Sequence, residues 1–226
     1  MRRKVSIQKD INEAVERFPK LMQRFDEKAN AWLLEGDLDI CDSMGEYWDT
    51  FSILIFIPGN YPHCVPKVIE KSKLIPREIN RHISEDGVCC LDMDHKLLHM
   101  ASRGIHLASF ISEQVYPFFA NQLYRDHSQD KNYASKEYNH NFKGVQQFYA
   151  EDLKIATAGL AVKVIERVLV NNIPGRNALC FCGSERKFKR CHTETIAFLR
   201  TLPADRLIKD LDGFLERDKP PLNLYP

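Results

Sequence analysis

The residues with the most specific chemistry lie near the C-terminus. Cys180 and Cys182 are separated by one residue, and after eight intervening residues Cys191 is followed directly by His192. Thiolates and imidazoles are preferred ligands of Zn²⁺, and four of them complete its tetrahedron. Gly183, between the two pairs, supplies backbone freedom for a tight turn. The spacing therefore predicts one structural zinc ion held by these four side chains, with no open position for catalysis.

The whole segment 174–192, PGRNALCFCGSERKFKRCH, closely resembles a known motif. Both ligand pairs, the leading Pro-Gly-Arg-Asn, the glycine and serine after the first pair and two lysines match the SEC-C motif. That motif is the metal-binding tail of the SecA translocation ATPase and is appended to many bacterial proteins. The resemblance implies zinc as the metal and a bacterial source.

The same segment is strongly basic. Its five basic residues against one acidic residue, Glu185, give a local charge of 5 − 1 = +4. Two interpretations stay open. The cations could form a docking surface for an acidic partner protein or for nucleic acid, or they could offset the negative charge of three thiolates around one Zn²⁺ and otherwise face solvent. The basic residues are Arg176, Arg186, Lys187, Lys189 and Arg190.

A second candidate site contains the adjacent residues Cys89 and Cys90. A strand ending at Pro58 is followed by YPHCVPKV at 61–68 and by DGVCCLD at 86–92. In order and separation, these pieces resemble the ubiquitin-conjugating enzymes over roughly residues 8–150. The resemblance implies an α+β fold, with an antiparallel meander flanked by helices, and makes Cys90 the acceptor of an acyl group.

The chemistry of such a site is acyl transfer through a thioester. A thiol accepts an acyl group, holds it as a reactive ester and passes it to an amine. The nucleophile must be an accessible thiolate on a shaped loop, near donors for the tetrahedral oxyanion. Cys90 has the required position, Gly87 allows close backbone approach, and Leu91 anchors the loop. Cys89, one residue earlier, is predicted to point into the core as a packing residue.

Two further residues are candidates for catalytic roles at this site. Eukaryotic ubiquitin-conjugating enzymes carry His-Pro-Asn upstream, and its Asn is assigned to oxyanion stabilisation; here the corresponding residues are Asn80, Arg81 and His82. The His82 imidazole could donate to the oxyanion or act as a base towards the amine, or it could simply bond loop carbonyls. Asp86 could orient His82 or the amine, and it is equally well explained as a turn residue.

A histidine in place of that asparagine is a feature of bacterial ubiquitin-conjugating-like families found in anti-phage operons of the CBASS type. In those operons the enzyme ligates the C-terminus of a cGAS-like nucleotidyltransferase, or of a ubiquitin-like protein, onto a target. This sequence shows no adenylating motif. The resemblance therefore implies a protein substrate delivered by a partner.

Two other functions remain open. The same fold with a catalytically inactive site could act as a binding module for a protein tail. The presence of Cys90 favours the enzyme, whereas the absence of His-Pro-Asn favours the binding module. A zinc-dependent adaptor that delivers clients to the secretion or nucleic-acid machinery is a further alternative. Trapping a thioester with the proteins of the neighbouring operon would discriminate among them.

Hydrophobic spacing predicts the elements that position these residues. We expect a helix over 8–30 that is kinked or split at Pro19, two strands that end at 42 and 57, a short third strand ending at 69, and an irregular connection over 75–91. Helical spacing returns at 105–124 and 139–170. Strands grouped between helices predict an α+β architecture.

The predicted organisation has four parts. A ubiquitin-conjugating-like domain covers 1–150 and a connecting helix covers 151–173. The zinc motif then covers 174–200, and an amphipathic helix with a tail covers 201–226.

Composition excludes several classes of protein. The chain has 226 residues, 44% hydrophobic and 28% charged, which is typical of a packed globular protein rather than a disordered one. Its net charge of +1 makes wholesale nucleic-acid binding unlikely as a global property. Apolar runs are too short for a membrane span. The charged start and the odd cysteine count of seven predict a cytoplasmic protein without disulfides.

Overall fold

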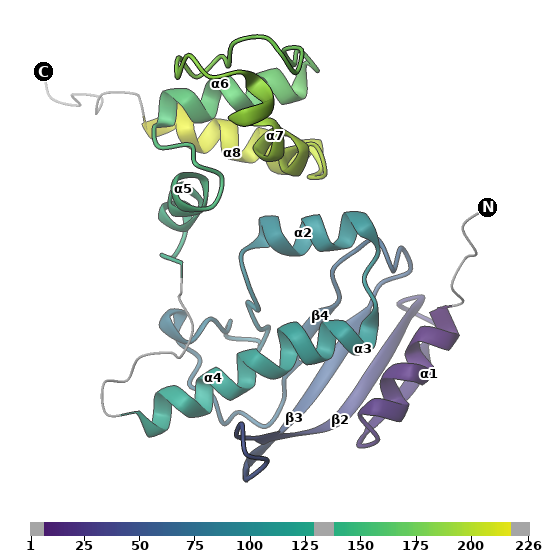
Figure 1. The fold of residues 1–226 in the computed structure, drawn as a ribbon. Coiled ribbons are helices and arrows are strands. Elements are labelled where there is room, and N and C mark those ends of the chain that lie inside the picture. The colour runs from purple at the N-terminus through teal and green to yellow at the C-terminus, as the bar shows by residue number, and fades with distance from the viewer. Residues whose placement is uncertain (1–6, 129–137, 218–226) are drawn as a thin grey trace, which may run out of the picture. The chain divides into compact units, whose positions relative to one another are not determined.

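The computed structural model describes residues 7–128 and 138–217. The chain divides into two compact units, residues 1–137 and 138–226 (Figure 1). Across the described residues, no helix is both long enough and apolar enough to span a bilayer. The first unit is α+β and the described part of the second is helical.

The first unit is built on a four-stranded antiparallel sheet with helices packed against it (Figure 1). The strand order β1-β2-β3-β4 is a simple meander, so the predicted α+β class and antiparallel meander are confirmed. The elements are α1 (Ile7–Arg17), β1 (Leu21–Asp26), β2 (Ala31–Cys41), β3 (Tyr47–Ile57), β4 (Lys67–Glu70), η1 (Ile79–Arg81), α2 (Asp94–Arg103), α3 (Leu107–Phe110), η2 (Ile111–Val115) and α4 (Tyr116–His127).

The core lies between one face of the sheet and the helices. Alternate residues of β3, from Phe51 to Ile57, are at most 1% exposed and join residues of α1, α3, η2 and α4 in one apolar cluster. The Phe51 and Phe119 rings lie 4.6 Å apart between centroids. Leu54 and Phe56, on the other face of β3, are only half-buried. The period-2 pattern thus determines which face of β3 packs.

The segment after α1 differs from the expectation. The helix ends at Arg17, before Pro19, and residues 21–26 form β1 instead of a second helical stretch. Proline removes a backbone donor and ends the helix. The following residues pair with β2 from Leu21 opposite Gly36 to Asp26 opposite Ala31. Hairpin pairing with the next strand therefore overrides the helical spacing of the apolar residues there.

The connection between β4 and α2 is irregular, as predicted for 75–91. It contains one helical turn, η1, and two isolated bridges, Ile69 with Val88 and Ile83 with Cys89. The first bridge joins the residues before Cys90 to β4, and the second joins them to the residue after His82. The loop is therefore attached to the sheet by backbone hydrogen bonds.

The second unit is a small helical assembly. Its elements are α5 (Phe142–Glu151), α6 (Ala158–Leu169), η3 (Phe188–Arg190), α7 (Thr193–Leu199) and α8 (Ala204–Arg217). Helix α6 packs on α8 and α7 (Figure 1). The predicted amphipathic helix corresponds to α8, while the predicted tail over 218–226 lies outside the described residues.

The boundary between the units lies earlier than expected. We placed it after residue 150, but residues 138–150 belong to the second unit. The Tyr149 hydroxyl donates a 2.9 Å hydrogen bond to Asp210, which is fully buried in α8. The Phe142 ring packs against Phe214, 5.0 Å between centroids. Helix α5 is thus part of the C-terminal core, and within 151–173 the helix is α6, whose Ala161, Val164 and Ile165 are buried.

Candidate functional site

The structure brings the four predicted metal ligands together. One ligand atom from each of Cys180, Cys182, Cys191 and His192 lies within 4.8 Å of every other, so the group could hold a metal ion. The Sγ atoms of Cys182 and Cys191 are 3.5 Å apart. His192 Nδ1 lies 3.3 Å from Cys180 Sγ and 3.2 Å from Cys191 Sγ.

Two short backbone elements position these ligands. Cys180 directly follows Leu179, which forms an isolated β-bridge with Lys187. The Cys180 N–H donates to the Arg186 carbonyl at 2.8 Å. The turn after the first ligand pair contains Gly183 at a φ of +81°, the left-handed region that glycine adopts without strain. Cys191 follows η3, and His192 directly precedes α7, at the N-cap position of that helix.

The donor set fits a tetrahedral ion. Metal–sulfur bonds of about 2.3 Å and metal–nitrogen bonds of about 2.05 Å give S···S edges of about 3.8 Å and S···N edges of about 3.6 Å. The shortest observed separations, 3.2 to 3.5 Å, are a few tenths of an ångström smaller. His192 Nε2 is buried and has no hydrogen-bond partner among the described residues. The ring is therefore oriented by its Nδ1 contacts and by stacking on Phe181, 5.9 Å between centroids.

The cluster is electrostatically asymmetric. Burial raises the pKa of the Cys180 thiol. Burial also acts to raise the pKa of Cys182, but hydrogen bonds from the Ser184 side chain and backbone and from the neighbouring thiols outweigh it and lower that pKa. A thiolate is thus favoured at Cys182, and thiolates are the form that binds metal.

The basic residues of this segment are all exposed. Only Arg186, of the five within the described segment, contacts a ligand sulfur: its Nη2 lies 3.5 Å from Cys191 Sγ. Arg186 is therefore the one basic residue of the five whose direct contact can offset thiolate charge.

The Cys90 segment is held in place by its own backbone. Cys89 N–H donates to the Val68 carbonyl at 2.9 Å, and Cys90 N–H donates to the His82 carbonyl at 2.8 Å. Successive side chains point to opposite sides, so Cys89 is buried at 8% exposure and Cys90 is exposed. Leu91 is half-buried and packs on the core cluster. The expected orientations of these three residues are observed.

Gly87 meets a steric requirement. Its φ is +82°, and a Cβ built there would lie 2.5 Å from the Glu70 carbonyl oxygen. Glu70 N–H donates to the Gly87 carbonyl at 2.8 Å, and Arg77 pairs with the buried Glu70 carboxylate at 2.5 Å. The turn thus lies directly against β4, and only glycine fits there without displacement.

Neither adjacent thiol is activated in this arrangement. Burial raises the pKa of Cys89 to about 12. Although the Cys90 residue is exposed, desolvation of its thiol, together with the nearby Asp94 carboxylate, also raises its pKa. The expected accessible side chain is therefore present, but it is a thiol rather than a thiolate at neutral pH.

The other two predicted catalytic residues occupy different positions. His82 is next to Cys90 through the backbone bond, and it has a φ of 52° and a ψ of 38°. Asp86 is exposed in the turn closed by the bond from Gly87 N–H to the Ser84 carbonyl, 2.9 Å. Its carboxylate has no hydrogen bond or ion pair with His82 within the described part of the chain. The turn interpretation of Asp86 agrees with this geometry.

Sequence reasoning missed two side chains that contact this loop from α4. Gln122 Nε2 donates to the Arg81 carbonyl at 3.1 Å, and Arg125 Nη1 donates to the Asn80 carbonyl at 2.5 Å. Gln122 is 2% exposed. A polar residue on the apolar stripe of a predicted helix was the available signal, since buried polar side chains need partners.

A second group of potential ligands lies in the first unit: Asp10, Glu13 and His106. Hydrogen bonds account for this group. The Tyr61 hydroxyl and the Leu107 N–H, at 3.1 Å, both donate to Asp10. His106 Nε2 lies 3.1 Å from Asp10 and 3.0 Å from Glu13. The group therefore fastens α1 to the start of α3.

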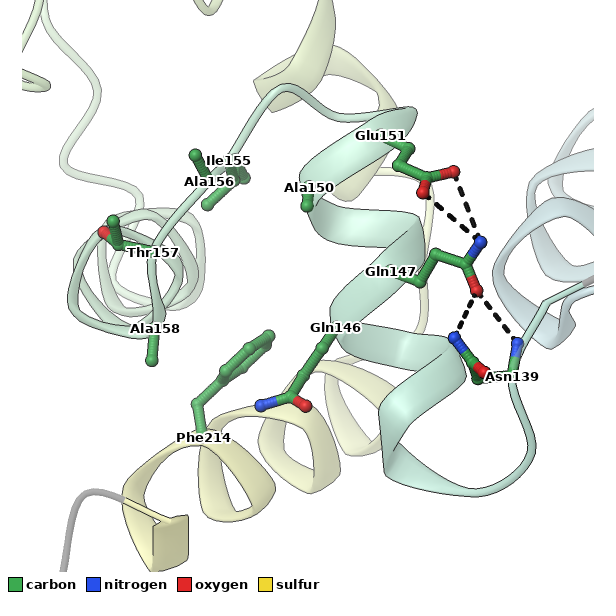
Figure 2. A pocket seen from close by; sticks show the side chains of 10 residues that line it. All are labelled: Asn139, Gln146, Gln147, Ala150, Glu151, Ile155, Ala156, Thr157, Ala158 and Phe214. Carbon is green, nitrogen blue, oxygen red and sulfur yellow. Dashed lines mark hydrogen bonds between the residues drawn. The ribbon is translucent and has the colours of Figure 1, made fainter.

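The second unit also contains a cavity of about 440 Å³ (Figure 2). It lies among α5, the start of α6 and Phe214 of α8. Gln147 in its wall accepts from the Asn139 backbone and side chain at 2.9 Å and donates to Glu151 at 3.3 Å. The polar atoms of Gln147 are therefore used within the wall rather than presented to a ligand.

Comparison with known proteins supports one part of the sequence interpretation. No curated protein and no solved structure matches the chain. The family model described as the SEC-C motif matches residues 176–193, the segment that contains all four clustered cysteine and histidine ligands. The chain therefore contains a segment similar to the SEC-C motif whose side chains could bind a metal ion.

Proposed function

We propose that this protein is a ubiquitin-conjugating-like acyl carrier whose acceptor is Cys90, with a structural zinc ion in its C-terminal unit. The observation that supports the carrier function is the arrangement of the Cys90 loop. An exposed thiol follows a buried one, and its backbone is bonded to His82. The loop follows a helix and a four-stranded meander, the order implied by the family resemblance.

The proposed reaction has two balanced steps. The Cys90 sulfur attacks the carbonyl carbon of an activated protein C-terminus, forming a C–S bond while the bond to the activating group breaks. An amine nitrogen then attacks the thioester, forming a C–N bond while the C–S bond breaks and the sulfur is released. The acyl group must arrive activated, as an acyl adenylate or thioester supplied by a partner protein.

Because the pKa of the Cys90 thiol is raised, the reaction needs help from neighbouring groups. A base must accept the thiol proton as sulfur attacks, and donors must stabilise the oxyanion. We assign to His82 either the donor to the oxyanion or the base towards the amine, and the thiol proton passes to a base in the solvent. Asp86 is exposed and makes no contact with His82 among the described residues, so we propose that it meets the incoming amine rather than orienting the imidazole.

The thioester can be tested with a synthetic donor. A peptide α-thioester is mixed with the protein, and intact mass spectrometry follows the acyl adduct and its later transfer to a lysine-containing peptide. We expect an adduct at Cys90 that hydroxylamine removes, with amine transfer faster than from a free-cysteine peptide. Cys90→Ala should abolish both steps and Cys64→Ala neither. An unchanged adduct in Cys90→Ala would contradict the acceptor assignment.

One observation favours an alternative function, a binding module for a protein tail. The Cys90 thiol is not activated, and the His-Pro-Asn pattern of the resembled enzymes is absent. The module predicts that amine transfer is no faster than from a free-cysteine peptide. It also predicts that Cys90→Ala leaves partner affinity unchanged.

The zinc proposal follows from the fit of the donor set. Cys180, Cys182, Cys191 and His192 would hold the ion, which would crosslink the turn at Gly183 to the start of α7. Four protein ligands leave no position for substrate, so the ion supplies stability. We expect one zinc per chain by elemental analysis, and Cys191→Ser should lose it. Protein purified without chelator that contains no zinc would contradict this.

The cellular setting is proposed from resemblance alone. The bacterial families that carry histidine at the position of His82 ligate a cGAS-like nucleotidyltransferase or a ubiquitin-like protein in anti-phage defence. We propose a cytoplasmic protein of that kind. Incubating the chain with ATP and the proteins encoded beside its gene should yield a Cys90 thioester, and no adduct with any of them would oppose this setting.

A further inference from the structure

The loop that carries the candidate acceptor is held by hydrogen bonds to three successive carbonyls. The Asn80 carbonyl accepts from Arg125, the Arg81 carbonyl accepts from Gln122, and the His82 carbonyl accepts from the Cys90 N–H. The first two donors are side chains of α4, which is far from the loop in sequence. The third bond fixes the backbone of the acceptor itself.

The conformation of His82 requires such support. Its φ of 52° and ψ of 38° are left-handed, a conformation that is unfavourable for a residue with a Cβ atom. A strained residue keeps its conformation only when its surroundings hold it. On one side, its N–H donates to the Ile79 carbonyl at 3.1 Å. On the other, its carbonyl accepts the Cys90 bond, so relaxation of His82 would move Cys90.

Gln122 is the buried anchor of this arrangement. Its amide contacts Arg81 twice: Nε2 donates to the Arg81 carbonyl at 3.1 Å, and Oε1 accepts from Arg81 Nη1 at 3.3 Å. The Arg81 guanidinium also pairs with Asp126 on the same helix. Because Gln122 is 2% exposed, water cannot readily replace its donor if the side chain is changed.

We propose that Gln122 is a positioning residue for Cys90. By holding the Arg81 carbonyl it keeps His82 left-handed, and His82 in turn holds the Cys90 amide at the angle needed for acyl transfer. The effect on transfer rate rests on the proposed acyl-carrier function. The effect on the loop does not.

The test variant is Gln122→Glu, which keeps the acceptor for Arg81 but removes the donor to its carbonyl. Gln122→Met, which has neither group and a similar volume, covers the case in which a buried carboxylate prevents folding. Tyr124→Phe, on an exposed position of the same helix, is the matched control.

The first measurement does not depend on any acyl activity. In Gln122→Glu or Gln122→Met, we expect the Cys90 amide to exchange with D₂O at least tenfold faster, with Tyr124→Phe unchanged. Iodoacetamide should label Cys90 faster while Cys89 stays unlabelled, because the loop opens and the core does not. Parallel labelling of Cys89 would indicate general unfolding, and that result, or an unchanged Cys90 amide, would overturn the positioning function.

The second measurement tests the catalytic consequence with the peptide thioester and the lysine peptide. We expect the rate at which Cys90 is acylated to stay within a factor of three of that of the original chain, because an open loop still exposes the sulfur. The rate of transfer to the amine should fall about tenfold, because the thioester is then misaligned. Equal transfer with a loosened loop would overturn the catalytic part. If the original chain forms no adduct, the proposed function fails, and the exchange measurement still decides whether Gln122 positions Cys90.

Discussion

Gly213 offers a direct test of how the C-terminal unit is assembled. A Cβ built at this position of α8 would lie 2.2 Å from Cε2 of Phe142 and 2.6 Å from two more atoms of that ring. Phe142 begins α5, the helix that we had expected to belong to the first domain. Gly213→Ala should therefore force the ring away from α8.

The magnitude follows from two opposing effects. Alanine in a helix interior is favoured over glycine by about 0.5–1 kcal/mol. Overpacking of a filled contact costs about 1–3 kcal/mol, and the displaced ring also loses its edge-to-face contact with Phe214. We expect a net loss of about 0.5–2 kcal/mol from the free energy of unfolding of the second unit.

The assay uses the placement of the two tryptophans. Trp32 and Trp48 both lie in the first unit, so their fluorescence follows that unit alone, whereas hydrogen exchange of α5 and α8 follows the second. Gly213→Ala should speed exchange in α5 and α8 and leave the fluorescence midpoint in urea unchanged. Gly159→Ala is the matched control, because nothing lies within 4 Å of its Cβ position.

A second substitution separates the clash from other effects. With Phe142→Ala in place, the ring is gone, and adding Gly213→Ala should be neutral or stabilising, a coupling of about 1–3 kcal/mol. If Gly213→Ala alone is as stable as Gly159→Ala, then α5 does not pack on α8, and the corrected boundary is wrong.

Three further outcomes are expected in the first unit. Asp10→Asn should lower its free energy of unfolding by about 1–3 kcal/mol, because the amide cannot accept equally well from Tyr61 and the backbone; unchanged urea unfolding followed by tryptophan fluorescence would contradict this. Cys89→Val should keep acyl transfer and cost under about 1.5 kcal/mol, and iodoacetamide should label Cys90 well before Cys89, whose pKa is about 12; the reverse order would mean that the acceptor is Cys89. Asp94→Asn removes a negative charge that disfavours the Cys90 thiolate, so the alkylation rate should rise at lower pH than in the original chain; an unshifted pH profile would show that the carboxylate does not act on the thiol.

The metal ligands could be identified from sequence because the site is local. All four lie within thirteen residues, and a glycine turn and a helix start suffice to bring them together. The orientation of Cys89 and Cys90 was equally accessible, since alternation along extended backbone sends one side chain inward and the other outward.

Other features depended on partners outside the segment itself. Residues 21–26 have helical spacing but form a strand, because β2 offers backbone partners at every position. Helix α5 joined the second unit because its aromatic residues pack against Asp210 and Phe214, some sixty residues later. No local pattern contains such partners.

The surroundings of Cys90 show the same division. Spacing alone placed Cys90, His82 and Gly87 in one loop. Only the tertiary structure added α4, whose Gln122 and Arg125 hold the loop carbonyls. Desolvation in the folded chain raises the pKa of the Cys90 thiol, and the Asp94 carboxylate, four residues along the chain, raises it further. Residue type and spacing thus determined which groups could react, while long-range packing decided their burial, orientation and protonation, because desolvation and hydrogen bonding depend on neighbours that only the folded chain brings together.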